Sequence, residues 1–427
     1  MTRREFMRLA AATLGTAALP VDLRGDQRSG AAPTESQDPR RGRSPGLDSL
    51  NLIYGDIRRH FIFEYYPWYG ADPIRHWDQD GRVPPIDLAS NYVPRLGAYD
   101  SRSTAVIEQH ARWIADAGTG AINISWWGRD SFEDKAVTTV MDVMRAHDIH
   151  VTFHLEPYGD RRVDNYASDI QYLMTQYGDR RHWDCMLLLQ HADGAVGPVF
   201  KSFFTILSAQ QTDCHGVTTP NPFYVADGAW RQQTDRVREM FRRDFDRVTI
   251  LSDSLDMGRM QAGGFDGAAI YSNYVRPETW RSYATAASTR GLVFSFNVNP
   301  GFDSIAARSV APNSCYTPFV FEPPTGPYDW SAQSERERAK SASASRIADS
   351  FHTTVDLQRD RHLSNATRGF FLVYICSFNE WHEGHQFEPM KDAADLTPAE
   401  RAIGYHNPAD GSYRLKLLTS LIAHAID

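Results

Sequence analysis

Residues 370–389 read FFLVYICSFNEWHEGHQFEP, and the rest of the chain is organised around them. The first six residues form a short apolar run of the kind that is typical of a buried strand. Three carboxylates follow, Glu380, Glu383 and Glu388, interleaved with an aromatic ring, two histidines and neutral amides. The ordinary interpretation is a hydrated acidic loop at a strand end. Carboxylates among rings and amides are also what a sugar-cleaving site needs, because one carboxyl protonates the leaving oxygen while a second works on the opposite face.

The chain before this stretch alternates between apolar runs of strand length and helical stretches. The strand-like runs are 61–66, 121–126, 150–154, 222–225, 248–251, 267–271, 292–298 and 370–378, and the helical stretches include 103–117, 135–146, 235–245, 278–289 and 335–355. Eight strands that alternate with helices predict an α/β fold, a single (β/α)8 TIM barrel with long strand–helix loops. The stretch 177–220 is interpreted as an insertion between the third and fourth strands. Its own apolar run at 186–189 leaves open that it holds a true strand.

The chain begins with a pattern that is typical of an export signal. Adjacent arginines at positions 3 and 4 precede an apolar run at 9–19, which is too short to span a bilayer but has the length of a signal's hydrophobic region. The pattern resembles a twin-arginine signal, with an amphipathic helix that caps the domain as the alternative. We expect a twin-arginine-type signal peptide at 1–20, a disordered linker at 21–50 and the catalytic domain at 51–427. The mature protein is expected to be periplasmic or extracellular.

The composition indicates an acidic domain with a surplus of aromatic rings. The 427 residues carry a formal net charge of −8, and 12% of them are aromatic. Such a domain has no general attraction to nucleic-acid backbones, and no segment approaches the ~20 apolar residues of a membrane-spanning helix. Surplus rings often line clefts, where the apolar faces of sugars stack on them. We therefore expect an oligo- or polysaccharide partner, no nucleic acid and no membrane insertion of the mature protein.

The sequence contains no pattern that requires a cofactor or a metal. A Gly-rich phosphate loop is absent, which argues against the use of a nucleotide. None of the four cysteines is arranged as CxxC or at zinc-finger spacing. Cys185 and Cys214 lie in one loop-rich region, and whether they form a disulfide is left open. We expect neither a cofactor nor a metal ion.

Polar and aromatic residues gather where the predicted strands end. In a barrel of this type the active site lies at the C-terminal ends of the strands. Taken singly, each of these residues would more often be a packing residue, but a barrel brings successive strand ends to one cleft. The candidates for substrate contact are Tyr66, Trp68, Tyr69, His76, Trp126, Trp127, His154, Glu156, Tyr158, Tyr271, Asn299, Asn379, Trp381 and His382, around the catalytic candidates Glu380 and Glu383.

Several of these segments together resemble glycoside hydrolase family 99, the endo-α-mannosidases and endo-α-mannanases. They are FEYYPWYG at 63–70, SWWG at 125–128, FHLEPYGDR at 153–161, NPGFD at 299–303 and SFNEWHEGHQFEP at 377–389. The resemblance implies a (β/α)8 retaining enzyme that cuts inside α-mannose-containing glycans without a metal. It also implies that Glu383 is the general acid/base. Glu380 would deprotonate the substrate 2-hydroxyl, which closes on the anomeric carbon to give a 1,2-anhydro sugar that water opens.

Three hypotheses follow, and the first is an exported endo-glycosidase that acts on α-mannan or a mannose-containing glycan. The second is the same fold and mechanism on another polysaccharide, an α-glucan or an anionic glycan. The sequence GDRR at 159–162 places two arginines beside the predicted cleft, which would suit an anionic substrate. The third is a non-catalytic glycan-binding protein, against which the presence of both Glu380 and Glu383 argues.

Overall fold

The computed structural model describes residues 48–158, 163–213, 215–273, 275–301 and 332–426. The predicted signal peptide and nearly all of the predicted linker lie outside these residues, as do GDRR at 159–162 and Cys214. Cys185 is a buried free thiol, so the structure gives no support to a disulfide at that position. Within the described part of the chain, no helix has both the length and the apolar character that crossing a membrane requires.

Eight parallel strands form a nearly closed barrel. In chain order they are β1 (Phe61–Tyr65), β4 (Ala121–Trp126), β5 (His150–Leu155), β7 (Val196–Ser202), β10 (Thr249–Ser252), β11 (Gly267–Ile270), β12 (Val293–Phe296) and β13 (Val373–Ile375). Each strand up to β12 pairs with the next in this order, and β13 returns to pair with β1. An isolated parallel bridge between Val298 and Ile375 joins the segments that follow β12 and form β13. The predicted single (β/α)8 barrel is confirmed.

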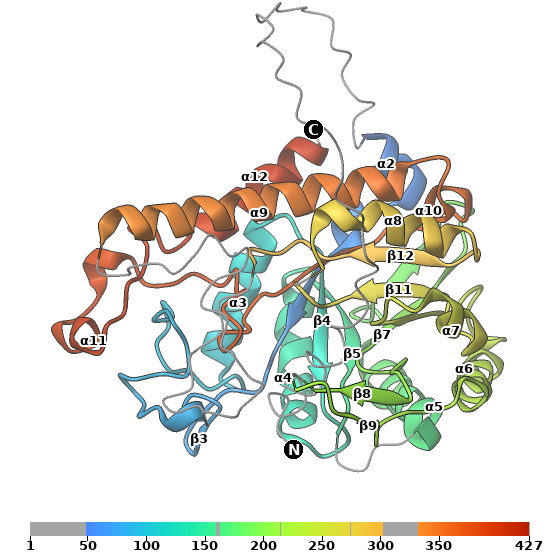
Figure 1. The fold of residues 1–427 in the computed structure, drawn as a ribbon, viewed down its shortest axis with the longest axis horizontal. Coiled ribbons are helices and arrows are strands. Elements are labelled where there is room, and N and C mark those ends of the chain that lie inside the picture. Colours follow the sequence, from blue (N-terminus) through green and yellow to red (C-terminus); the bar gives the residue numbers. More distant parts are fainter. Residues whose placement is uncertain (1–47, 159–162, 214, 274, 302–331, 427) are drawn as a thin grey trace, which may run out of the picture.

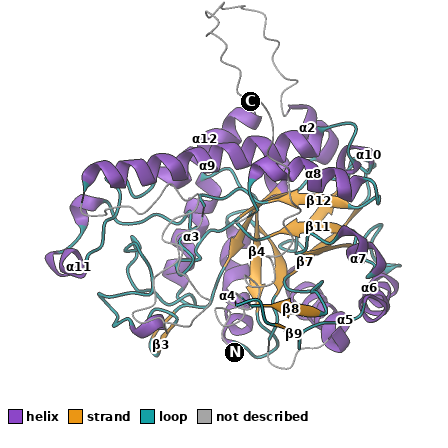
Figure 2. Ribbon diagram, in the orientation of Figure 1, coloured by secondary structure: helices purple, strands orange, loops and turns teal. Residues whose placement is uncertain are grey.

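Helices surround the strands, as Figure 1 and Figure 2 show. They are α2 (Asp48–Tyr54), α3 (Thr104–Asp116), α4 (Phe132–Ala146), α5 (Tyr166–Leu173), α6 (Asp227–Phe241), α7 (Met257–Ala262), α8 (Pro277–Ser288), α9 (Gln333–Arg359), α10 (Ser364–Thr367), α11 (Pro398–Ile403) and α12 (Tyr413–Ile426). A π-helical segment, η4 (Met174–His182), follows α5, and short 3-10 turns are η1 (Ile57–His60), η2 (Gln79–Gly81), η3 (Val163–Asn165) and η5 (Ala393–Asp395). In Figure 1 the long helix α9 runs beside α12 along one side of the molecule.

Short strands decorate the barrel outside its ring. They are β2 (Gly70–Ala71) with β3 (Ile74–Arg75), β8 (Gln210–Thr212) with β9 (Thr218–Pro220), and β6 (Leu188–Gln190), which pairs antiparallel with β7. The β2–β3 hairpin follows β1, and the β8–β9 hairpin follows β7. Both therefore belong to the strand–helix loops at the C-terminal end of the barrel, which the sequence predicted to be long.

The fourth barrel strand is not the one that the sequence analysis expected. The apolar run at 222–225 forms a turn and loop that leads into α6. The fourth strand is β7, which lies within 177–220, so the stretch interpreted as an insertion contains a true strand. Gly197 and Pro198 near its start and the buried charge of Lys201 near its end leave β7 without a continuous apolar run, which explains why it was not recognised.

Side chains alternate between the two faces of each strand, which places a polar layer inside the barrel. On β1, Phe61 and Phe63 pack in the core between strands and helices, while Ile62 belongs to the apolar cluster within the barrel. The strand register sets Glu64 of β1 opposite Asn123 of β4. Among the side chains that point into the barrel, the apolar ones therefore lie near the N-terminal ends of the strands. The polar ones lie near the C-terminal ends, next to the loop that follows β13.

Glu64 is the centre of this polar layer. Its carboxylate accepts hydrogen bonds from Lys201 Nζ at 2.5 Å and from Asn123 Nδ2 at 2.9 Å, and lies 3.1 Å from Nδ1 of His154. All four side chains are fully buried. Burial alone raises the pKa of Glu64, but the charge of Lys201 and the contact with His154 outweigh it and lower the pKa to about 2. Glu64 is therefore an ionised carboxylate in a buried ion pair.

Replacement of Glu64 with Ala is expected to destabilise the fold by about 3–5 kcal/mol, because Lys201 is left as an uncompensated charge inside the barrel. Urea unfolding followed by circular dichroism measures this loss. The matched control combines Glu64→Gln with Lys201→Met, which removes both charges and should recover most of the stability. A single Glu64→Ala variant as stable as the wild type would show that no such ion pair forms.

The low pKa of Glu64 predicts that the folded protein loses stability in acid. The folded pKa of this carboxylate, about 2, lies below the ordinary value of 4.5, so its contribution is fully present above pH 4.5 and is lost as the pH falls through 2. Between these limits the wild type should lose on the order of 3 kcal/mol more than the charge-free double variant. Urea unfolding of both proteins across this range checks the difference, and parallel pH profiles would contradict it.

Candidate active site

The loop that follows β13 carries both predicted catalytic carboxylates and folds back on itself. The backbone N–H of Ser377 donates to the carbonyl oxygen of His385 at 3.0 Å, which closes the loop. The N–H of Phe378 donates to the carbonyl oxygen of Glu64 at 2.8 Å and ties the loop to the end of β1. Gly384 has a φ of 69° at the turn between the two arms, a left-handed conformation that favours glycine. The loop is therefore anchored at the C-terminal mouth of the barrel.

Two residues predicted to contact substrate instead hold this loop in place. Asn379 accepts a hydrogen bond from the backbone N–H of Tyr66 at 2.7 Å and donates to its carbonyl oxygen at 3.0 Å. Trp381 donates its Nε1–H to the buried carboxylate of Glu388 at 2.8 Å, and Tyr99 donates to the same oxygen. The third carboxylate of the motif is thus a structural acceptor. We place Asn379 and Trp381 in the support of the loop rather than in contact with a sugar.

The two carboxylate oxygens of Glu380 differ in their hydrogen-bond partners. One carboxylate oxygen, Oε1, accepts the backbone N–H of His382 at 3.2 Å and lies 3.0 Å from its Nδ1. The other oxygen, Oε2, is buried and has no hydrogen-bond partner among the described residues. Because the full residue is only 1% exposed, that oxygen requires a hydrogen-bond donor, which a substrate hydroxyl or a water can supply.

The ring of His382 is oriented by its second nitrogen. Nε2 lies 2.7 Å from the carbonyl oxygen of His76, and since a carbonyl only accepts, Nε2 carries a proton. The Tyr69 hydroxyl lies 3.3 Å from Nδ1 and accepts the N–H of Trp381 at 3.0 Å. Burial raises the pKa of Tyr69 well above its ordinary value, and the charge of Glu380 raises it further, so the phenol keeps its proton. These groups fix the position of Oε1 of Glu380.

Glu383 belongs to a triangle of hydrogen-bonding groups. Its Oε2 forms a short hydrogen bond with the hydroxyl of Tyr271, at the end of β11, and lies 2.9 Å from Nε2 of His385. The Tyr271 hydroxyl and His385 Nε2 are themselves 3.0 Å apart. Glu383 is buried but is more exposed than Glu380.

The two carboxylates converge on one point. One atom each of Glu380, Glu383 and His385 lie within 4.8 Å of one another, and in the described part of the chain no other group of acidic, His or Cys side chains is close enough to surround an ion. Two of these atoms already bond to each other and to Tyr271, so we assign no metal to the group. What the arrangement offers chemically is a pair of carboxylates close enough to act on neighbouring atoms of one substrate.

Aromatic rings form a wall beside Glu380. Trp68 stacks on the ring of His76 with centroids 4.7 Å apart and lies 4.9 Å from Tyr66, 6.3 Å from Trp127 and 5.9 Å from His382. The loop after β1 and the end of β4 thus bring their rings together next to the carboxylates. Flat rings in this place are suited to the apolar face of a pyranose.

His154 and Glu156 line the mouth of the barrel below the loop. Ser125 donates to Oε1 of Glu156 at 2.8 Å, and Trp127 donates to the Ser125 hydroxyl at 3.0 Å. The ring of His154 lies 6.2 Å from that of Tyr271. His154 is therefore linked to Glu383 through Tyr271, and Glu156 is linked to Trp127 through Ser125.

Three predicted contact residues face away from this group. Trp126 donates its Nε1–H to Asp134 of α4 at 2.7 Å, because the alternation along β4 turns it outward while Ser125 points inward. Tyr158 donates to Asp169 of α5 at 2.8 Å. Asn299 is buried and bonds to Asn297 and to Arg346 of α9, which places it behind the site.

Sequence analysis did not single out several residues that the structure places at the site. Glu64 was visible in the motif at 63–70, and the alternation along β1 was a signal that it points inward. Lys201 gave no signal, because its strand was not recognised. Ser377 and His385 were read only as part of the motif, since their contact depends on how the loop folds back.

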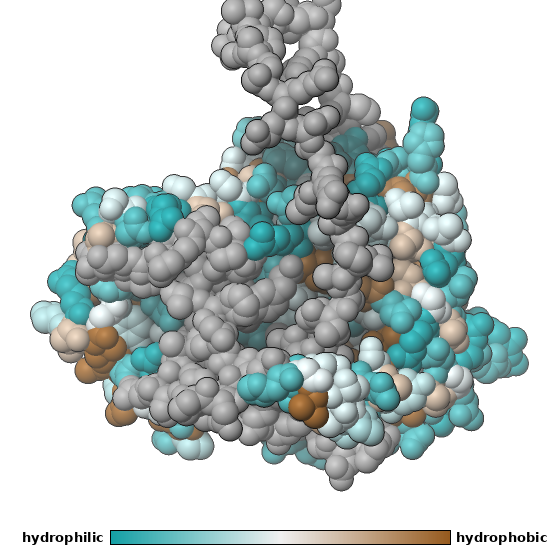
Figure 3. Space-filling model, viewed as in Figure 1, coloured by the Kyte–Doolittle hydropathy of each residue, from teal (hydrophilic) through white to brown (hydrophobic). Residues whose placement is uncertain are grey.

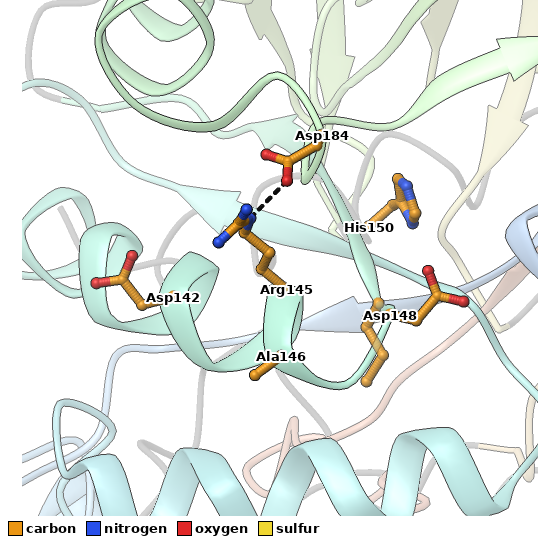
Figure 4. Close-up of a pocket in the computed structure, with 7 residues that line it drawn as sticks. Asp142, Arg145, Ala146, Asp148, His150 and Asp184 are labelled. Carbon is orange, nitrogen blue, oxygen red and sulfur yellow. Dashed lines mark hydrogen bonds and ion pairs between the residues drawn. The ribbon is translucent and has the colours of Figure 1, made fainter.

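A hollow of about 250 Å³ lies at the opposite end of the barrel, between the end of α4 and the start of β5 (Figure 4). Its charged groups are paired with one another or with their neighbours. Arg145 contacts Asp184 at 2.6 Å, and Asp148 contacts Arg58 at 2.8 Å. In barrels this end is associated with stability rather than catalysis.

The face of the molecule seen in Figure 3 is mainly hydrophilic where the structure is described, with hydrophobic side chains, in brown, scattered over it.

Comparisons with known proteins show what the chain is similar to. The family model Glycosyl hydrolase family 99 matches residues 57–185. The mouse protein "Glycoprotein endo-alpha-1,2-mannosidase" is 24% identical over 358 residues, which are 76% of this chain and 66% of that protein. A zebrafish "Glycoprotein endo-alpha-1,2-mannosidase-like protein" is 25% identical over 381 residues, 81% of this chain and 74% of that protein. The fold is similar to that of the GH99 endo-alpha-mannosidase from Bacteroides thetaiotaomicron, with a TM-score of 0.61, 21% identity, and coverage of 86% of this chain and 97% of that one.

Proposed function

Because the chain is a glycoside hydrolase family 99-like protein, we propose that it hydrolyses internal α-mannosidic bonds of an oligo- or polysaccharide with retention of configuration. The observation that carries the proposal is the convergence of Glu380 and Glu383, whose oxygens come within 4.8 Å of each other. Retaining sites place their two carboxyl groups about 5–5.5 Å apart, whereas inverting sites need about 6.5–9.5 Å to admit a water. The limit of 4.8 Å on the nearest oxygens of the two groups is below the inverting range, which supports retention.

The first step assigns one carboxyl to each side of the reaction. Oε2 of Glu380, the oxygen without a partner among the described residues, accepts the proton of the sugar 2-hydroxyl. The freed oxygen forms a bond to the anomeric carbon as the glycosidic bond breaks. The leaving oxygen takes the proton of Glu383, so the products of this step are a 1,2-anhydro sugar and an alcohol. His382 and the backbone hold Oε1 of Glu380 so that Oε2 faces the substrate.

The second step reverses both proton transfers. A water molecule gives its proton to Glu383 and bonds to the anomeric carbon, while the bond from that carbon to the 2-oxygen breaks. The 2-oxygen recovers its proton from Glu380. The net change is addition of one water across the glycosidic bond, and both carboxyls return to their initial states. The rings of Trp68 and Trp127 would hold the pyranose during both steps.

A polysaccharide panel with product analysis tests the proposal. The purified chain is incubated with α-mannan, an α-glucan and an anionic glycan, and the products are separated by chromatography and mass spectrometry. We expect oligosaccharides from α-mannan, which shows cleavage inside the chain rather than release of single sugars from an end. Oligosaccharides from another glycan would indicate the same chemistry on a different substrate. Retention on α-mannan without products would indicate a binding protein.

We also propose that the protein is exported, on the basis of the paired arginines at positions 3 and 4 and the apolar run at 9–19. A twin-arginine signal loses its function when both arginines become lysine, although the charge is unchanged. Fractionation of bacterial cells that express the full chain should find the wild type outside the cytoplasm and the double-lysine variant within it. An identical distribution of both proteins would contradict export by this route.

A further inference from the structure

His385 is buried within the site and links the carboxylate of Glu383 to the backbone of Glu380 through hydrogen bonds. On one side its Nε2 lies 2.9 Å from Oε2 of Glu383. On the other side its Nδ1 lies 3.0 Å from the hydroxyl of Ser377. That hydroxyl also accepts the backbone N–H of Glu380 at 2.8 Å. The chain of contacts therefore runs from the peptide of one carboxylate residue to the carboxylate of the other.

These contacts can be satisfied in two protonation patterns. When Glu383 is ionised, Nε2–H of His385 donates to it and Nδ1 accepts the hydroxyl proton of Ser377. When Glu383 carries the proton, it donates to Nε2, and Nδ1–H donates to the same hydroxyl oxygen. Ser377 serves both patterns because a hydroxyl is donor and acceptor, and its bond from Glu380 needs only a lone pair. In the second pattern the proton can pass from Glu383 to Nε2, which leaves an ionised Glu383 and an imidazolium whose two N–H groups donate to Glu383 and to Ser377.

We propose that His385 shares the proton of Glu383, so that the acid group of the reaction is a Glu383–His385 pair rather than a single carboxyl. This inference rests on the proposed function, in which Glu383 must carry a proton in the first step and be ionised in the second. An imidazole in contact with the carboxyl brings the protonated and ionised forms of Glu383 closer in free energy. His385 is therefore a positioning residue that acts through Glu383 and does not need to touch the sugar.

Other groups around His385 are consistent with this role. The Tyr271 hydroxyl, from β11, lies 3.0 Å from Nε2, and Cys376 Sγ, from the end of β13, lies 3.8 Å from Nδ1. From α12, Arg414 donates to the carbonyl oxygens of Gly384 and Gln386 at 2.8 and 2.9 Å, on either side of His385. These two hydrogen bonds of Arg414 fix the backbone on both sides of His385, and so fix the position of its ring.

The pair is expected to titrate as a unit. The pair keeps the shared proton to a higher pH than a carboxyl without a basic neighbour does, because that proton can reside on the imidazole. The acid needed for the first step is then kept further into the neutral range. The basic limb of the pH–rate profile is the observable that reports this difference.

Two variants of His385 separate proton sharing from simple positioning. Gln places its amide nitrogen near the position of Nε2, so His385→Gln keeps a hydrogen bond to Glu383 but cannot carry the proton. Asn places its amide near Nδ1, so His385→Asn keeps the contact with Ser377 and loses the contact with Glu383. Thermal unfolding of both variants controls for folding, and kcat/KM is measured on the active glycan from about pH 4 to about pH 9.

In the Gln variant we expect the basic limb to move to lower pH by about one unit or more, which is about a tenfold loss of rate on that side, with a smaller loss of rate at low pH. The Asn variant should show the same shift and an additional loss of kcat at every pH, with KM little changed. A Gln variant with the wild-type profile would reduce His385 to an orienting group and overturn the proposal.

A measurement without turnover keeps this inference separate from the proposed function. With 15N-labelled histidine, the ring-nitrogen shifts of His385, assigned by their loss in His385→Gln, are followed against pH in the wild type and in Glu383→Gln. Sharing predicts that the titration of His385 changes when Glu383 cannot ionise. Unchanged shifts would overturn the sharing even if the wild type is active. Inactivity on every glycan with coupled shifts would leave the pair intact and remove the hydrolytic function.

Discussion

Glu383→Gln is expected to lower kcat on α-mannan by about 10³-fold while the fold survives, because the variant cannot protonate the leaving oxygen. Gln has the shape of Glu and can still accept from Tyr271 and His385, so the loss reports the proton and not the packing. Turnover assays with matched thermal unfolding measure the effect.

Substrates with different leaving groups test the role of Glu383 as the acid more specifically. A substrate whose leaving group is a stable anion needs little protonation, so the Glu383→Gln variant should recover much of its first-step rate on an aryl or fluoride α-mannoside. The matched control is Glu388→Gln, which alters a buried carboxylate of the same motif that binds Trp381 and Tyr99. That variant should lose stability rather than show a leaving-group dependence. Full activity of Glu383→Gln on α-mannan would remove Glu383 from the mechanism.

Glu380→Gln is expected to cause a loss at least as large, about 10³-fold or more, on all substrates. The reason is that Oε2 of Glu380 is the acceptor for the 2-hydroxyl proton, and an amide is a poor base. A better leaving group does not replace this function, so no recovery is expected on activated α-mannosides. The same assays therefore separate the two carboxylates by the pattern of recovery.

A matched control for Glu380 is Asn379→Ala, which changes the neighbouring residue and removes its bonds to the backbone of Tyr66. It should lower the unfolding temperature and lower activity through the position of the loop, to an extent that depends on temperature. Recovery of Glu380→Gln on an activated substrate would contradict the assignment of Glu380 as the base, since it would then behave as an acid.

Much of the fold could be predicted because the barrel strands are buried on both faces and read as apolar runs. The runs at 121–126 and 150–154 correspond to β4 and β5 nearly residue for residue. β7 was missed for the opposite reason. It buries Lys201 against Glu64, and a pairing between distant strands leaves no local signal in the sequence.

The candidate site was predictable in its location and less so in the direction of each side chain. The motif at 376–389 predicted Glu380 and Glu383. The positions of predicted strand ends predicted Trp68, Tyr271 and His154. Position at a strand end does not reveal which face a residue occupies, and for that reason Trp126 was assigned to the cleft although it bonds to Asp134. The role of His385 depends on a loop that closes between Ser377 and His385, a contact that spacing alone cannot supply.

The most direct test of the central claim is the anomeric configuration of the first product. The claim is that Glu380 and Glu383 bring about two successive displacements at one anomeric carbon, Glu380 through the 2-hydroxyl and Glu383 through the leaving oxygen. Proton NMR of an α-mannan digest, recorded in the first minutes before the sugar ends equilibrate, should show new reducing ends in the α form. New ends in the β form would mean a single displacement by water, and that result would contradict the account.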